Sequence, residues 1–102
     1  MEKILSLLGF TKKAGKLVAG TNAVLRSILY GDAYLVIITE DAGNSVKDKF
    51  KRICDENDVK LYVLGNSKDL ERATGEENKV IYSVTEAGFS NKLVQLIESL
   101  EK

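Results

Sequence analysis

Residues 20–42 read GTNAVLRSILYGDAYLVIITEDA, a segment in which two different spacings of apolar residues follow each other. The first half has the three- and four-residue spacing of a helix, which we predict over residues 21–30 and which Gly31 is suited to end. The second half, residues 33–40, is an unbroken apolar run, typical of a strand buried on both faces of a sheet. The helix is expected to turn inward Val24, Leu25, Ile28 and Leu29.

The rest of the chain continues this alternation of helix and strand. Further helices are predicted over 2–13, 46–56, 67–73 and 87–100, and further strands over 16–19, 59–65 and 79–84. Proline and low-complexity linkers are absent, so residues 1–102 are expected to form a single domain rather than two units. The order of elements predicts an α/β fold, a three-layer α/β/α sandwich with a small four-stranded mixed sheet.

Polar residues stand at several expected helix starts. Thr21 and Asn22 are able to cap the helix over 21–30, and Ser45 is expected to cap the helix over 46–56. Ser67 is the predicted cap of the helix over 67–73, and Asp41 is predicted to cap a loop.

The composition argues against an enzyme. Among 102 residues there is no histidine, which removes the commonest general base and the usual metal ligand. Cys54 is the only cysteine and lies at an apolar helical position, so we predict a buried, inert thiol. We expect neither a metal nor a cofactor. The N-terminal segment lacks the pattern of a signal peptide and no run is long enough to cross a membrane, so a cytoplasmic, monomeric protein is expected.

The net charge is zero, but the charges are unevenly distributed. Residues 3–31 carry five cations and no acid, whereas residues 32–102 carry ten cations and fourteen acids. This asymmetry predicts a localised basic face on an otherwise acidic body.

The junction at Gly20 lies within the basic segment. A helix start offers unpaired N–H groups and partial positive charge, and a glycine lets a ligand approach the backbone. Arg26 lies one helical turn beyond Asn22 and is able to form a forked contact with a phosphate or a guanine edge. These features suit a phosphate-bearing ligand. They equally fit a turn glycine, a capping Thr21 and a solvated Arg26.

Three segments resemble one known family. GTNAVLRSILYGDAYLVIITEDA and LGNSKDLERATG, residues 20–42 and 64–75, resemble the kink-turn RNA-binding family of ribosomal proteins of the archaeal and eukaryotic large subunit. VTEAGFSNKLVQLI, residues 84–97, resembles its small bacterial YlxQ-like branch. The resemblance implies a non-enzymatic protein that binds a sharply bent RNA containing sheared G·A pairs, with ribosomal RNA among the possible partners.

The resemblance also implies which residues contact RNA. Gly20 would allow close approach, with Thr21 in the same segment, while Asn22 and Arg26 would contact the G·A bases and nearby phosphates. The loop from Gly75 to Val80, which contains Lys79, would lie beside an extruded nucleotide. The resemblance also assigns two lysines to basic family positions near RNA phosphates: Lys16, at the end of the strand before Gly20, and Lys68. Both are equally explained as solvated lysines.

Two departures from the family pattern bear on affinity. Ala23 stands where the family usually has a glutamate that accepts from guanine edges. The loop carries Glu76 and Glu77, two acids expected to face phosphates and to weaken binding.

Two other hypotheses therefore stay open beside RNA binding. One is a protein-interaction module of the same fold with reduced RNA affinity, and the other is a phosphate-binding enzyme subunit. Glu40 is not assigned to a metal site, because no second acidic cluster accompanies it. The four tyrosines are predicted to be packing groups, and they are Tyr30, Tyr34, Tyr62 and Tyr82.

Overall fold

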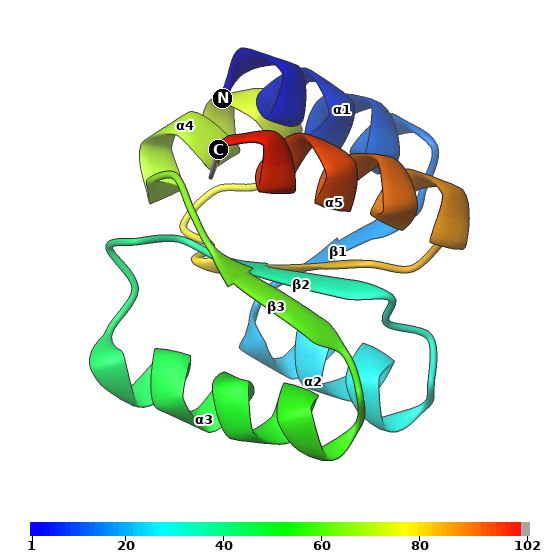
Figure 1. Ribbon diagram of the computed structural model, residues 1–102. Coiled ribbons are helices and arrows are strands. Elements are labelled where there is room, and N and C mark those ends of the chain that lie inside the picture. Colours follow the sequence, from blue (N-terminus) through cyan, green and yellow to red (C-terminus); the bar gives the residue numbers. More distant parts are fainter. Residues whose placement is uncertain (101–102) are drawn as a thin grey trace.

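Helices and strands alternate along residues 1–100, the part of the chain that the computed structural model describes (Figure 1). The elements are α1 (Glu2–Lys13), β1 (Leu17–Ala19), α2 (Thr21–Leu29), β2 (Leu35–Ile38), α3 (Asn44–Glu56), β3 (Lys60–Val63), α4 (Ser67–Thr74), β4 (Ile81–Val84) and α5 (Ala87–Leu100). Every predicted helix and strand is present and in the predicted order. Helices α1, α4 and α5 cover one face of the sheet and α2 and α3 the other, so the predicted three-layer sandwich is confirmed (Figure 1).

The sheet is mixed, as predicted, and its strand order is β1-β4-β2-β3. Strands β2 and β3 are parallel, while β4 runs antiparallel to both of its neighbours, β1 and β2. The C-terminal ends of β1, β2 and β3 therefore meet the start of β4 at one end of the sheet. We call this the Gly20 end, because Gly20 directly follows β1. The opposite end, where β1 begins, is the Lys16 end.

Strand β2 supplies the centre of the core. Its four residues are fully buried, and they alternate between the two faces. Leu35 and Ile37 pack in the cluster formed with α1, α4 and α5, while Val36 and Ile38 pack in the cluster formed with α2 and α3. Each such side chain contributes roughly 1.5–3 kcal/mol by leaving water. The apolar run thus anchors both helical layers, as expected of a strand buried on both faces.

The predicted helix caps are mostly wrong. The N-cap of α2 is Gly20, and no side chain caps this helix, because Thr21 and Asn22 are already helical residues. Helix α3 begins after Gly43 with no side-chain cap, so Ser45 lies inside it. The cap of α4 is Asn66, whose side-chain oxygen accepts from the Asp69 N–H at 2.8 Å.

Asp41 has the capping role predicted for it, but toward a distant segment. Its carboxylate accepts from the backbone N–H of Ser67 at 3.0 Å and from the Ser67 hydroxyl at 2.5 Å. The hydrogen bond from the Ser67 hydroxyl is the main reason that the pKa of Asp41 is lowered. Asp41 therefore joins the loop after β2 to the start of α4, and it is engaged in structure rather than in an acid–base pair.

Cys54 and the tyrosines complete the test of the predicted core. Cys54 is buried, as predicted, and burial raises the pKa of its thiol to about 11. Tyr82 is fully buried, but Tyr30 and Tyr34 are 74% and 51% exposed, so predicting these two as packing groups was wrong. Their positions at the end of α2 and just before β2 turn the side chains out of both clusters. No helix in residues 1–100 is long and apolar enough to cross a membrane.

Candidate nucleic-acid interface

Gly20 joins β1 to α2 with a backbone shape that needs glycine. Its φ of 97° and ψ of 153° lie in a region that is essentially restricted to glycine. The Gly20 N–H donates to the Ile81 carbonyl at 2.9 Å, and the Gly20 carbonyl accepts from the Val24 N–H at 3.0 Å. This geometry fixes the start of α2 beside the start of β4. Within residues 1–100, no side chain caps the first N–H groups of α2. These groups therefore lie unpaired at the Gly20 end of the sheet.

Lys79 lies directly over Gly20. A Cβ placed on Gly20 would stand 3.4 Å from Lys79 Nζ and 3.6 Å from Lys79 Cδ. The Lys79 side chain therefore lies against the face of Gly20 that carries no side chain. Gly20 and Lys79, two predicted site residues far apart in the sequence, are thus close in space. The Lys79 ammonium lies beside the N-terminus of α2.

Asn22 and Arg26 lie on the outer side of α2. Both side chains are exposed, and neither forms a side-chain hydrogen bond or an ion pair within residues 1–100. Val24 and Ile28 provide the fully buried face of this helix, so Arg26 has no part in the core. Leu29 was expected to face inward but is 61% exposed. The buried face of α2 is therefore narrower than predicted. Thr21 is exposed at the same helix start.

The chain is similar to known proteins along most of its length. The sequence profile of the "Ribosomal protein L7Ae/L30e/S12e/Gadd45 family" matches residues 2–94. The chain belongs to this family. The resemblance seen in the sequence, including its YlxQ-like branch, is thereby confirmed.

Two curated relatives and one solved structure illustrate the match. RNA-binding protein YlxQ of Bacillus subtilis is 35% identical over 92 residues, covering 90% of this chain and 92% of the relative. The large ribosomal subunit protein eL8 of Thermoplasma volcanium is 28% identical over 106 aligned positions, covering 99% and 88% of the two chains. A Bacillus halodurans protein solved without a known function has 38% identity and a TM-score of 0.92, covering 96% of this chain and 99% of its own.

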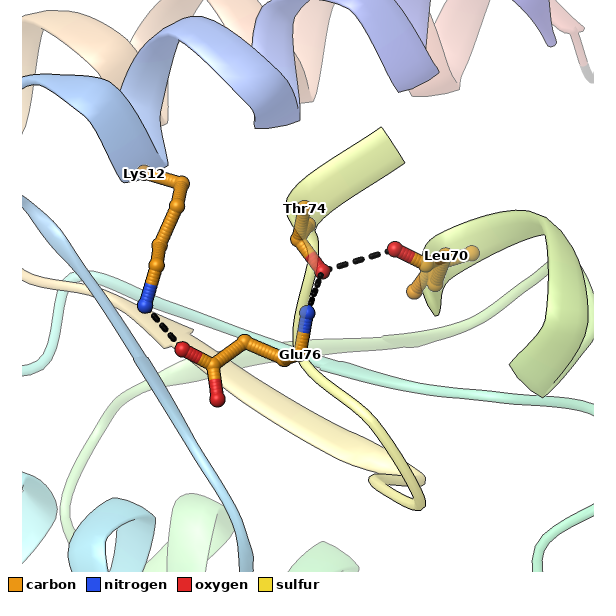
Figure 2. A network of polar contacts seen from close by, with 4 residues as sticks. All are labelled: Lys12, Leu70, Thr74 and Glu76. Atoms are coloured by element: carbon orange, nitrogen blue, oxygen red, sulfur yellow. Dashed lines mark hydrogen bonds and ion pairs between the residues drawn. The ribbon is translucent and has the colours of Figure 1, made fainter. Parts of the chain in front are cut away.

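Glu76 anchors the loop that lies between α4 and β4 and carries Lys79. Figure 2 shows the Glu76 carboxylate directed at the Lys12 ammonium of α1, with which it forms a close ion pair. The backbone N–H of Glu76 donates to the Thr74 hydroxyl at 3.2 Å, and that hydroxyl donates to the Leu70 carbonyl at 2.7 Å. Glu76 thus ties the loop to α1 and α4, and its approach to RNA phosphates stays a prediction. Glu77 is exposed.

Gly75 has a structural role that its membership in the predicted contact loop did not reveal. It is the C-cap of α4, with a left-handed φ of 77°, and its N–H donates to the Glu71 carbonyl at 2.7 Å. Gly75 ends α4 and directs the chain toward Lys79. Its backbone contact with RNA stays a prediction.

Lys16 and Lys68 are both separated from Gly20. Lys16 precedes β1 instead of ending it, and its carbonyl accepts from the Thr85 N–H at 2.9 Å at the Lys16 end of the sheet. Four residues of extended chain place it about 13 Å from Gly20. Lys68 is exposed in the first turn of α4, which follows β3 at the Gly20 end. Three strand spacings, about 14 Å, separate β1 from β3 across the sheet.

The ion pair of Lys12 with Glu76 is the contact that sequence reasoning missed. These residues are 64 positions apart, and nothing in either local pattern links them. Within residues 1–100, no group of three His, Cys, Asp or Glu residues is arranged to hold a metal.

We predict that Glu77→Gln strengthens RNA binding and leaves stability unchanged. Glu77 is the exposed acid of the loop that carries Lys79, so its charge opposes phosphates that approach Gly20. The gain is expected to be largest at low salt, because exposed charges are screened over about 8–10 Å at ordinary ionic strength. Titrations of a structured RNA across a range of salt concentrations measure it.

Two matched variants isolate this effect. Glu56→Gln removes an exposed acid at the end of α3, at the Lys16 end of the sheet, and should leave RNA binding unchanged. Equal gains for Glu56→Gln and Glu77→Gln would mean that only net charge matters. Glu76→Gln removes the ion pair with Lys12, and we expect the free energy of unfolding to fall by up to about 1 kcal/mol.

Proposed function

We propose that this protein is a non-enzymatic RNA-binding protein that recognises a kink-turn or a related internal loop in structured RNA. We propose that it acts in the cytoplasm, as a monomer without a cofactor, and that ribosomal RNA is among its partners. The observation that carries the proposal is the convergence of Gly20, Lys79, Asn22 and Arg26 on one uncapped helix start. The RNA-binding name of the Bacillus subtilis relative and the ribosomal name of the archaeal one support it.

The chemistry of this helix start suits RNA in three ways. The uncapped N–H groups of α2 and the Lys79 ammonium attract phosphate oxygens. The Asn22 amide both donates and accepts, as reading the edge of a base requires. Arg26, one turn further along, offers forked donors to a guanine edge or to a phosphate.

The spread of the basic residues favours a macromolecular ligand over a small phosphate compound. Lys68 lies in α4, which follows β3, and β3 is three strand spacings, about 14 Å, from β1 and Gly20 across the sheet. A single small phosphate does not span that distance, whereas an RNA backbone presents a row of phosphates. This argues for RNA over the phosphate-binding enzyme subunit.

A protein-interaction module of the same fold is the second candidate, and Ala23 is the observation that favours it. Ala23 is half-buried and offers no carboxylate to accept from a guanine amino group. Asn22 would then have to supply base recognition with less help than in proteins that carry an acid at this position. Reduced RNA affinity would follow.

A gel-shift titration with a kink-turn RNA and with a control whose G·A pairs are disrupted tests the proposal. We expect binding to the kink-turn RNA and clearly weaker binding to the control. Equal affinity for the two RNAs would contradict recognition of the internal loop. Absence of binding to both would favour the protein-interaction module.

A further inference from the structure

The exposed side of α2 continues beyond Arg26 to an aromatic residue. Asn22, Arg26 and Tyr30 follow each other at four-residue intervals, so they form one stripe along the helix. Tyr30 is the C-cap of α2 in a helical conformation, and its N–H donates to the Arg26 carbonyl at 3.0 Å. It is 74% exposed, the largest exposure among the exposed large hydrophobic side chains of residues 1–100. Its position places an accessible ring about 12 Å along the helix from Asn22.

A groove runs beside this stripe. Its volume is about 430 Å³, and it lies between α2 and β1, which is an edge strand of the sheet. The residues that line it include Val18, Ala23, Arg26, Tyr30, Asp32 and Thr85. It therefore combines apolar surface, an aromatic ring, a guanidinium and a carboxylate within one open depression.

We propose that this groove is a binding site for an unpaired nucleobase that flanks the internal loop bound at Gly20. A base stacks on the exposed ring of Tyr30, which is how proteins hold single-stranded nucleotides with little dependence on sequence. Arg26, one helical turn before Tyr30 on the same side of the groove, contacts the phosphate of the same nucleotide. The Asp32 carboxylate accepts from an exocyclic amino group, which favours adenine or cytosine over uracil.

The nucleobase site rests on the proposed function, because one residue, Arg26, belongs both to the groove and to the proposed RNA-binding helix start. Arg26 lines the groove and is also part of the helix start at the Gly20 end. An RNA held by Asn22 and Arg26 therefore has its flanking nucleotides directed along α2 toward Tyr30. The Lys16 carbonyl accepts from the N–H of Thr85, a lining residue, so Lys16 is next to this groove in the fold.

The experiment uses one kink-turn RNA with fully paired arms and a set of variants with a single bulged 2-aminopurine. The bulge is placed in turn beside each base pair nearest the internal loop, in both arms. Affinity and fluorescence are measured for the intact protein and for Tyr30→Ala, Tyr30→Phe and Tyr34→Ala. Tyr30 and Tyr34 are both exposed, so none of the variants removes a buried side chain.

At one bulge position we expect binding about tenfold tighter than for the fully paired RNA, with quenched fluorescence. Tyr30→Ala should lose the gain and the quenching, while Tyr30→Phe, which keeps the ring, and Tyr34→Ala, which lies outside the groove, should retain both. The nucleobase site is overturned if no bulge tightens binding, or if the gain survives in Tyr30→Ala. Failure of the proposed function gives a different result, since the fully paired kink-turn RNA would then not bind better than its G·A-disrupted control.

Discussion

Arg26→Ala is expected to weaken binding of a kink-turn RNA by roughly 1–3 kcal/mol, which is about fivefold to more than a hundredfold in affinity. The Arg26 guanidinium is exposed and has no ion-pair partner within residues 1–100, so its donors are available to RNA. Val24 and Ile28 hold α2 against the sheet, and the substitution therefore leaves no cavity. A titration at fixed salt, together with thermal unfolding, measures affinity and stability on the same protein.

Arg26→Lys and Arg52→Ala provide the matched controls. Lysine keeps the charge but lacks the forked donors, so its loss should be intermediate. Arg52 is an exposed arginine in α3, outside the predicted contact residues, and its removal tests the effect of one charge alone. A sharp fall in stability for Arg26→Ala with unchanged RNA affinity would make Arg26 a structural residue and refute its role.

The layered fold was predictable because its central strand, β2, is one unbroken apolar run in the sequence. Leu35 to Ile38 have no polar residue among them, and only a strand covered on both faces accommodates such a sequence. The helical spacing of the flanking segments then supplied the two outer layers. Neither pattern contains information about strand order, because pairing partners are chosen by contacts between distant segments.

The predictions of the helix caps were wrong for a related reason. Thr21, Ser45 and Ser67 are all suitable capping residues, yet the caps observed are glycines at two helices and Asn66 at the third. In α2, the cap position is set by the turn from β1, which requires the positive φ of Gly20. The capping preferences of these residues placed each helix start close to its observed position. The path of the chain determined which residue is the cap.

The candidate site was predictable where one segment contains it and not where two segments meet. Gly20, Asn22 and Arg26 lie within seven consecutive residues, so their spatial relation follows from helical geometry. The ion pair between Lys12 and Glu76 joins α1 to a loop beyond α4, and only the packing of those helices brings the charges together. The predicted strand over 16–19 differs from β1 (Leu17–Ala19) by one residue, so Lys16 lies where the strand begins, at the end of the sheet opposite Gly20.

Gly20→Ala is expected to reduce both stability and RNA binding, and the comparison with another glycine separates the two effects. At φ 97° and ψ 153°, an alanine strains the backbone by about 1–3 kcal/mol. Its Cβ would also lie in van der Waals contact with the Lys79 ammonium, at 3.4 Å, and would cover the bare backbone through which RNA approaches the helix start. Losing one charge-assisted contact costs roughly 1.5–3 kcal/mol, so we expect RNA affinity to fall about tenfold or more.

Gly31→Ala is the matched control, because Gly31 also has a positive φ, 79°, but a Cβ there would meet nothing within 4 Å. It should lower the free energy of unfolding by about 1–2 kcal/mol and leave RNA binding unchanged when both proteins are compared fully folded. Lys79→Gln, which removes the ammonium without straining the backbone, should reproduce part of the affinity lost in Gly20→Ala. Normal RNA affinity in both Gly20→Ala and Lys79→Gln would show that RNA does not approach the junction of β1 and α2. Loss in Gly20→Ala alone would instead mean that the bare backbone of Gly20, rather than the lysine above it, is what the RNA requires.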